Sequence, residues 1–233
     1  MSPPFIIAID GPSASGKGTL ARKLASLLDF AHLDTGLLYR ATGLAVLRAG
    51  GDPLDREMAE EAARALAQAL TDPASQADFQ GVDLRALWQD EALRGDAAGV
   101  AASKVAAIDS VRASLLRFQK NFCAAPPEGK RGAVLDGRDI GTVIAPDAKA
   151  KIFVTASAET RADRRFKELQ MRGIPTLYTE VLADMRARDA RDSERAIAPT
   201  KPAPDAFLLD TTALDAAQAL EAAYAFVQKK LWL

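Results

Sequence analysis

Residues 5–19 are FIIAIDGPSASGKGT, and this stretch predicts three consecutive elements. The apolar run Phe5–Ile9 is short, rich in isoleucine and followed by Asp-Gly-Pro, which is typical of a buried strand that ends in a loop. From residue 19 to residue 28 the leucines recur at helical spacing. We therefore expect a strand, a glycine-rich loop and a helix, in that order.

The loop between them has the spacing of a phosphate-binding loop. Gly11 and Gly16 lie five positions apart and Lys17 follows, but Gly18 takes the place where the strict pattern G-x-x-x-x-G-K-[ST] has a hydroxyl residue. Glycines let backbone N–H groups converge on phosphate oxygens, the helix N-terminus adds partial positive charge, and the lysine can bridge β- and γ-phosphates. We expect the whole loop to hold phosphates: Gly11, Pro12, Ser13, Ala14, Ser15, Gly16, Lys17, Gly18 and Thr19.

Composition limits the class of protein. The chain has 233 residues, 48% of them hydrophobic and 26% charged, and a formal net charge of -1, values close to those of soluble globular domains. Collagen-like, disordered and disulfide-scaffold proteins are excluded. The single cysteine, Cys123, cannot form an intramolecular disulfide, and the single histidine, His32, excludes a zinc site built on several histidines. We expect Cys123 on a helix face and His32 in packing or at the surface.

The sequence gives no sign of a membrane or nucleic-acid partner. Its first residues, MSPPFIIAID, lack the basic segment and the long apolar run of a signal peptide, and no run approaches the ~18 apolar residues of a membrane span. A net charge near zero argues against bulk attraction to nucleic acid. We expect a cytoplasmic protein, and a monomer, since nothing indicates an obligate oligomer.

Strands and helices are expected to alternate along the chain. This order predicts an α/β fold, with a parallel sheet and helices on both of its faces, of the P-loop NTPase type. We expect one domain over 1–233, with a small excursion over about 71–95 whose Pro, Ser, Gln and Asp content differs from its surroundings. The expected strands are 5–9, 31–33, 133–135, 151–155 and 206–209, and the expected helices are 19–28, 37–49, 54–70, 96–107, 110–123, 160–171, 178–191 and 214–231. The helix at 54–70 is expected to be capped by Asp52, with Pro53 at its start.

Two polar segments follow predicted strands, where ligands bind in open α/β sheets. In the first, LDTGLLYR at 33–40, Arg40 lies one helical turn past Gly36 and could reach back to a phosphate at the helix start. In the second, LDGRD at 135–139, Arg138 can fork onto a phosphate and Asp139 can accept from an amine or a hydroxyl. Asp136 is the carboxylate best placed to orient water molecules on Mg²⁺.

A third segment is rich in arginine. Arg161, Arg164 and Arg165 share a helical face, and eight arginines lie between residues 161 and 195, against two lysines over 156–205. A solvated helix face can explain such a pattern. The preference for arginine over lysine, however, favours bidentate recognition of phosphates. Phosphate transfer between two nucleotides brings at least four phosphate groups together, and their charge has to be compensated.

The motifs GPSASGKGT, LDTGLLYR, DGRDIGTVIAPDAKAKIF and RDARDSERAIAP occur in this order, and together they resemble the bacterial cytidylate kinase family. The resemblance extends from about Ile6 to Leu231. Other nucleoside monophosphate kinases share the fold and the loop but not the last two motifs. The resemblance implies transfer of the γ-phosphoryl group of ATP to CMP or dCMP with Mg²⁺. It also places the excursion at 71–95 on the substrate side.

We expect a mobile lid over about 157–196, from which Arg161 and Arg165 close over the transferring group, and Mg²⁺ near Asp136 through water. The expected catalytic residues are Lys17, Arg161, Arg165 and Arg188. The resemblance, matched residue by residue, implies these acceptor-binding residues: Thr35, Arg40, Ser103, Arg112, Arg138, Asp139, Arg188, Asp192 and Arg195.

Two alternatives stay open at this point. One is a P-loop kinase for another acceptor, such as UMP, AMP or shikimate, which the DGRD and RDARDSER motifs disfavour. The other is a nucleotide-binding module without a second substrate, although the guanine-reading N-K-x-D motif of a GTPase is absent from the sequence. The preference among CMP, dCMP and UMP, the range of phosphate donors and the role of the excursion are open as well.

Overall fold

A computed structural model describes residues 3–194 and 198–231, and these form two compact units. The first, here the sheet unit, consists of Met1–Leu33 and Cys123–Leu233, and the second, here the helical unit, is Asp34–Phe122. The predicted excursion over 71–95 lies inside the helical unit, which is considerably longer. No helix of the described residues is long and apolar enough to cross a membrane.

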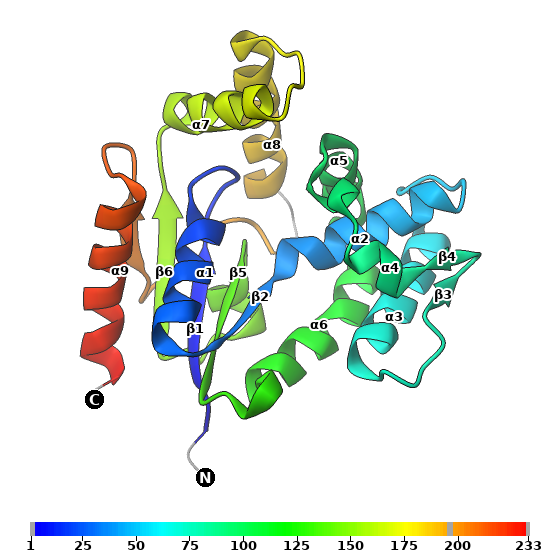
Figure 1. Ribbon diagram of the computed structural model, residues 1–233, viewed down its shortest axis with the longest axis horizontal. Coiled ribbons are helices and arrows are strands. Elements are labelled where there is room, and N and C mark those ends of the chain that lie inside the picture. The colour runs from blue at the N-terminus through cyan, green and yellow to red at the C-terminus, as the bar shows by residue number, and fades with distance from the viewer. Residues whose placement is uncertain (1–2, 195–197, 232–233) are drawn as a thin grey trace. The chain divides into compact units, whose positions relative to one another are not determined.

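The sheet unit is built on five strands (Figure 1). Their order across the sheet is β2-β5-β1-β6-β7, and β1 pairs in parallel with both β5 and β6, as β6 does with β7. The bounds are β1 (Phe5–Asp10), β2 (Ala31–Asp34), β5 (Gly132–Gly137), β6 (Ala150–Thr155) and β7 (Phe207–Asp210). The predicted α/β class with a parallel sheet is confirmed, and each expected strand lies within two residues of its predicted bounds.

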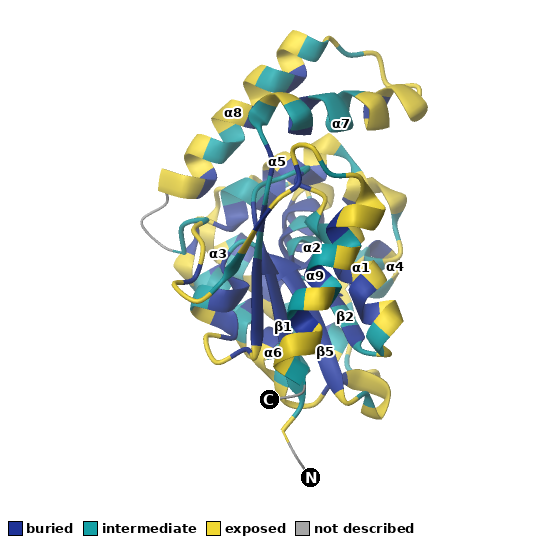
Figure 2. Ribbon diagram, turned by 90° about the vertical axis from the view of Figure 1, so that its left-hand side faces the viewer, coloured by how far each residue is buried: buried dark blue, intermediate teal, exposed yellow. Residues whose placement is uncertain are grey.

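Apolar runs form these strands because the sheet is covered. Ile7, Ile9 and Val134 have no exposed surface, and Figure 2 shows β1 and β5 as buried along most of their length. Helices α1 (Lys17–Leu28) and α9 (Ala216–Leu231) contribute their apolar faces to the same core. Burial of these side chains is the main source of stability at ~25 cal/mol per Å² of apolar surface.

Helices α7 (Ala158–Met171) and α8 (Tyr178–Glu194) of the sheet unit pack against each other. They share a small apolar cluster of Ala162, Leu169, Val181 and Met185, against which Ala14 of the phosphate loop also packs. Outside this cluster α8 is mostly exposed, whereas α7 is about equally half-buried and exposed. The pair therefore has a much smaller core than the sheet.

The helical unit contains α2 (Thr35–Arg48), α3 (Arg56–Thr71), α4 (Leu84–Trp88), α5 (Asp96–Val105) and most of α6 (Asp109–Ala124). Helices α2 and α5 approach closely at Gly43, where an added Cβ would lie 2.7 Å from the Cβ of Ala101. Helix α3 begins later than expected, because Asp55 rather than Asp52 caps it by accepting from the amides of Glu57 and Met58. The predicted cap at Asp52 is therefore wrong.

The 71–95 stretch forms a two-stranded hairpin and two short helical segments. Strands β3 (Asp78–Phe79) and β4 (Val82–Asp83) are antiparallel, and they are followed by α4 and a 3₁₀ turn at Glu91–Arg94. Its buried side chains, Phe79, Leu84, Leu87 and Leu93, attach it to the core of the helical unit. The excursion is thus a packed part of that unit.

Candidate active site

The phosphate loop connects β1 to α1, and glycine is required at its first position. Gly11 has φ +147°, and a Cβ added there would lie 2.0 Å from the carbonyl oxygen of Val154 on the neighbouring strand. Gly16, with φ +90°, directly precedes α1 and cannot cap its first amide groups with a side chain. The first turn of α1 therefore offers main-chain donors to an anion rather than to a capping residue.

Two hydroxyl groups in the loop also suit a phosphate ligand. The Oγ atoms of Ser13 and Ser15 are buried and have no hydrogen-bond partner among the described residues. Buried hydroxyls are nearly always paired, so this arrangement fits a bound group with acceptor oxygens. Lys17 lies across the loop, where its Nζ donates to the carbonyl oxygen of Pro12 at 3.1 Å.

The loop is held from behind by residues that sequence reasoning did not assign. Thr211 Oγ1, at the end of β7, donates to the carbonyl oxygen of Ser15 at 3.0 Å. Arg164 donates to Thr211 Oγ1 at 3.0 Å and to the Thr211 carbonyl oxygen at 2.7 Å. Arg164, expected on the basic face of its helix, therefore supports the loop. In the sequence, the only signal for the contact between Thr211 and the loop is that Thr211 comes soon after the predicted strand at 206–209.

The carboxylate of Asp136 lies at the start of α1. Asp136 is the second-last residue of the buried strand β5. Its Oδ2 is 3.5 Å from the position that a Cβ on Gly18 would take. Its Oδ1 is 2.8 Å from His32 Nε2. We expected His32 in packing or at the surface, and the structure instead makes it a partner of this carboxylate. The two residues are 104 positions apart on β2 and β5, which no local pattern reveals.

The residues at this site fit a Mg²⁺ ion that is held mainly by substrate phosphates and water rather than by protein side chains. No cluster of three or more His, Cys, Asp or Glu side chains that could hold a metal occurs in the part of the chain described. One buried carboxylate, Asp136, beside a phosphate loop matches the way Mg²⁺ is held in kinases, by one or two carboxylates, substrate phosphates and water.

A second carboxylate, Asp10, lies at the junction of β1 and the loop. Its side chain accepts from the amides of Ile140 and Gly141, each at 2.8 Å. Burial raises the pKa of Asp10 to about 6, although these hydrogen bonds and Lys17 act in the opposite direction. The sequence analysis did not single out this residue, because a strand-terminal aspartate before a glycine is equally typical of a turn.

Three of the predicted acceptor residues meet in the sheet unit. The buried Asp192 of α8 accepts from Arg138 Nε at 3.1 Å, and Arg188 Nε lies 4.0 Å from the same oxygen. Asp139 follows Arg138 and is 5% exposed. Two guanidinium groups thus gather around one carboxylate at the end of β5. The predicted Arg195 lies outside the described residues.

The two arginines predicted to close over the transferring group, Arg161 and Arg165, have ion-pair partners in this structure. Arg161 makes a bidentate contact to Asp189 of α8, at 3.1 Å and 2.6 Å, and donates to the carbonyl oxygen of Ser13 at 3.3 Å. Arg165 pairs with Glu168 at 2.8 Å. Arg161 therefore already joins α7, α8 and the phosphate loop.

The remaining predicted acceptor residues belong to the helical unit. Arg40 donates to the carbonyl oxygens of Leu93 and Gly95, at 2.8 Å and 3.0 Å. Its guanidinium is 3.2 Å from the position of a Cβ on Gly99, so the glycine leaves room for it. Arg112 lies over the ring of Tyr39, with 5.7 Å between guanidinium carbon and ring centroid.

Two smaller predicted acceptor residues, Thr35 and Ser103, also lie on helices of the helical unit. Thr35, the first residue of α2, is buried, and Ser103 is half-buried on α5. The predicted acceptor residues are therefore divided between the sheet unit and the helical unit.

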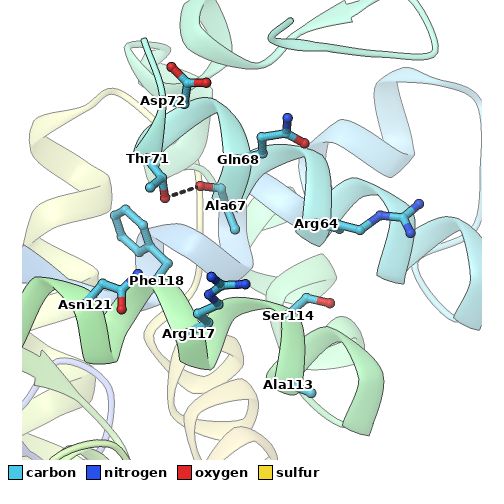
Figure 3. Close-up of a pocket in the computed structure, with 10 residues that line it drawn as sticks. All are labelled: Arg64, Ala67, Gln68, Thr71, Asp72, Ala113, Ser114, Arg117, Phe118 and Asn121. Atoms are coloured by element: carbon cyan, nitrogen blue, oxygen red, sulfur yellow. Dashed lines mark hydrogen bonds between the residues drawn. The ribbon is translucent and has the colours of Figure 1, made fainter. Parts of the chain in front are cut away.

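A groove of about 450 Å³ lies between α3 and α6 of the helical unit (Figure 3). Arg64 and Arg117 line it together with Phe118 and several polar side chains. None of the predicted site residues is among its lining residues.

Comparisons with known proteins agree with these motifs. The family model described as cytidylate kinase matches residues 7–229. A protein named cytidylate kinase from Paramagnetospirillum magneticum is 56% identical over 97% of this chain and 98% of its own length. One of the same name from Rhodospirillum rubrum is 56% identical over 94% and 95%, respectively. Among solved structures, one from Thermus thermophilus covers 99% of both chains with 22% identity and a TM-score of 0.46.

Proposed function

This chain belongs to the cytidylate kinase family, and from that premise we propose that it transfers the γ-phosphoryl group of ATP to CMP or dCMP. The products are ADP and CDP or dCDP. The observation that carries the proposal is the cluster of Asp192 with Arg138 and Arg188 in the same unit as the phosphate loop. A nucleotide-hydrolysing module with no second substrate needs no such additional site for phosphate and sugar groups.

The phosphate loop binds the donor. Its main-chain amides at the start of α1, together with the hydroxyls of Ser13 and Ser15, donate to the ATP phosphates. Lys17 moves from the carbonyl oxygen of Pro12 to the transferring phosphoryl group, where its charge compensates that of the transition state. The ties from Arg164 and Thr211 keep the loop in place during transfer.

Asp136 is the residue that would hold Mg²⁺, through water, beside the donor phosphates. When bound, this ion neutralises phosphate charge. The hydrogen bond with His32 fixes the Oδ1 atom of Asp136 and so sets the orientation of the carboxylate toward the start of α1.

Residues of the sheet unit bind the acceptor. Arg138 and Arg188 supply positive charge for the acceptor phosphate, and Asp192 orients both guanidinium groups and accepts from a ribose hydroxyl. Asp139 accepts from the exocyclic amine of cytosine. As the family resemblance implies, we also assign Thr35, Arg40, Ser103, Arg112 and Arg195 to the recognition of CMP.

The chemistry needs neither a general base nor a covalent intermediate. The acceptor phosphate is already anionic near neutral pH, so positioning and charge compensation suffice. Burial raises the pKa of Cys123 to about 11, which keeps this thiol protonated and unreactive. Arg161 and Arg165 close over the transferring group and exclude water, which suppresses hydrolysis of ATP. We further propose that the protein works as a cytoplasmic monomer.

The direct test follows the label of [γ-³²P]ATP in the presence of Mg²⁺ and CMP. We expect the label in CDP, in amounts that equal the ADP formed, and none without enzyme. Label released as inorganic phosphate at the same rate with and without CMP would contradict the proposal and indicate an ATPase.

A further inference from the structure

Asp10 has no role in the mechanism above, yet its carboxylate makes two specific contacts. It ends β1, one residue before the phosphate loop, and is 4% exposed. Oδ1 accepts from the amide of Ile140 and Oδ2 from the amide of Gly141, both at 2.8 Å. Each oxygen therefore binds one of two consecutive amides that lie 130 and 131 positions further along the chain.

These two amides directly follow Asp139. The carbonyl oxygen of Asp139 accepts from Val143 at 2.9 Å and from Ile144 at 3.3 Å, within the single π-helical turn Ile140–Ile144. Asp139 does not cap this turn with its own side chain. Asp10 takes the place of that cap, so the main chain leaving Asp139 is held by a residue from another strand.

The fit between Asp10 and this turn leaves little space. A Cβ added to Gly141 would lie 3.4 Å from Asp10 Oδ2 and 3.2 Å from Lys151 Cδ. The charged groups facing Asp10 are Lys17, which favours its ionised form, and Asp139, which disfavours it. A buried carboxylate without a salt bridge is costly, and here two main-chain hydrogen bonds offset part of that penalty.

From this geometry we propose that Asp10 is a positioning residue that holds Asp139 for recognition of the acceptor base. Because Asp10 also ends the strand that carries the phosphate loop, one side chain fixes the base-reading carboxylate relative to the donor site. The inference rests on the proposed function, since it takes Asp139 as the group that reads the cytosine amine.

Asp10→Asn tests this role with little change in size. The amide has one acceptor oxygen, so one of the two main-chain amides loses its partner and the peptide after Asp139 shifts. We expect the KM for CMP to rise at least about tenfold, the scale of one lost hydrogen bond to a buried charged group, while the KM for ATP stays within about twofold. Gly141→Ala perturbs the same contact from the opposite side and is expected to raise the KM for CMP without a comparable change for ATP.

Asp215→Ala is the matched control. Asp215 also accepts from two main-chain amides, those of Ala217 at 2.7 Å and Gln218 at 2.9 Å, at the start of α9. Its loss is expected to lower the melting temperature and leave both KM values unchanged. This comparison separates a positioning effect from a general loss of stability.

The measurement is a steady-state titration of CMP at saturating ATP, and of ATP at saturating CMP, for all four proteins. Unchanged KM for CMP in Asp10→Asn and Gly141→Ala would overturn the proposal, as would equal rises for both substrates. If Asp10→Asn does not fold, Gly141→Ala alone decides between these results. A wild-type protein without CMP-dependent ADP formation removes the proposed function itself, and the role of Asp10 with it.

Discussion

The buried carboxyl of Asp10 is predicted to make stability depend on pH in an unusual direction. Burial raises its pKa from 3.8 to about 6 in the folded protein. At ~1.4 kcal/mol for each pH unit, this difference of about 2.2 corresponds to about 3 kcal/mol. Solvent screens this carboxyl little, because Asp10 is 4% exposed.

The sign follows from the number of protons bound. Between about pH 3.8 and pH 6 the folded protein binds more protons at Asp10 than the unfolded chain does. The contribution of this group to the free energy of unfolding is therefore fully present below about pH 3.8 and is lost as the pH rises through about 6. Exposed carboxylates such as Asp210 and Asp215 act oppositely, since hydrogen bonds lower their pKa.

The Asp10→Asn variant isolates this effect, because the other carboxylates cancel in the difference from wild type. We expect the free energy of unfolding of wild type, minus that of the variant, to increase by about 2 kcal/mol between about pH 7.5 and about pH 4.5. Urea denaturation followed by circular dichroism at several pH values measures it. Asp215→Asn serves as the control: because hydrogen bonds lower the pKa of Asp215 below 3.8, its contribution is lost only at more acidic pH, and its difference from wild type is expected to stay nearly constant over this range.

A difference between wild type and Asp10→Asn that stays constant over this pH range would give Asp10 an ordinary pKa and contradict the prediction. A difference that decreases as the pH falls would contradict it as well, because that result would give Asp10 a lowered pKa in the folded state.

Three further predictions concern the candidate site. Lys17→Ala should reduce kcat by orders of magnitude with little change in melting temperature, and near-normal turnover would remove Lys17 from the mechanism. Gly11→Ala should destabilise the protein by about 3 kcal/mol or more, because the new methyl would lie 2.0 Å from the Val154 carbonyl oxygen. Thermal denaturation measures this loss. Gly50→Ala is the control, because φ is also positive there but no atom lies within 4 Å of the added Cβ. Asp139→Ala should raise the KM for CMP and leave that for ATP unaltered, and identical CMP and UMP kinetics in variant and wild type would exclude a role in base reading.

The sheet and the phosphate loop were predictable because their signals are local. Buried parallel strands need continuous apolar runs, such as Phe5–Ile9, whatever their neighbours are. The loop depends on glycine at fixed spacing, and the close approach of Gly11 to Val154 gives the physical reason. Arg138 and Asp192, both assigned to the acceptor by the family resemblance, are in contact in the sheet unit, while their role in binding stays a prediction.

The supporting contacts were not predictable, because they join residues far apart in the sequence. The pair of His32 with Asp136 depends on which strands are neighbours in the sheet, which residue spacing does not reveal. The same is true of Asp10 and its amides. The cap of α3 was misplaced because Asp52 and Asp55 are equally good capping residues; Asp52 instead accepts from the amide of Leu54 in the turn that precedes the helix.

Acceptor specificity is the most direct test of whether this chain phosphorylates cytidine monophosphates. ADP release is measured with Mg²⁺ and ATP in the presence of CMP, dCMP, UMP, AMP, GMP or no acceptor. We predict fast turnover with CMP and dCMP and little with the others. Equal turnover with every acceptor, or turnover that needs none, would contradict it.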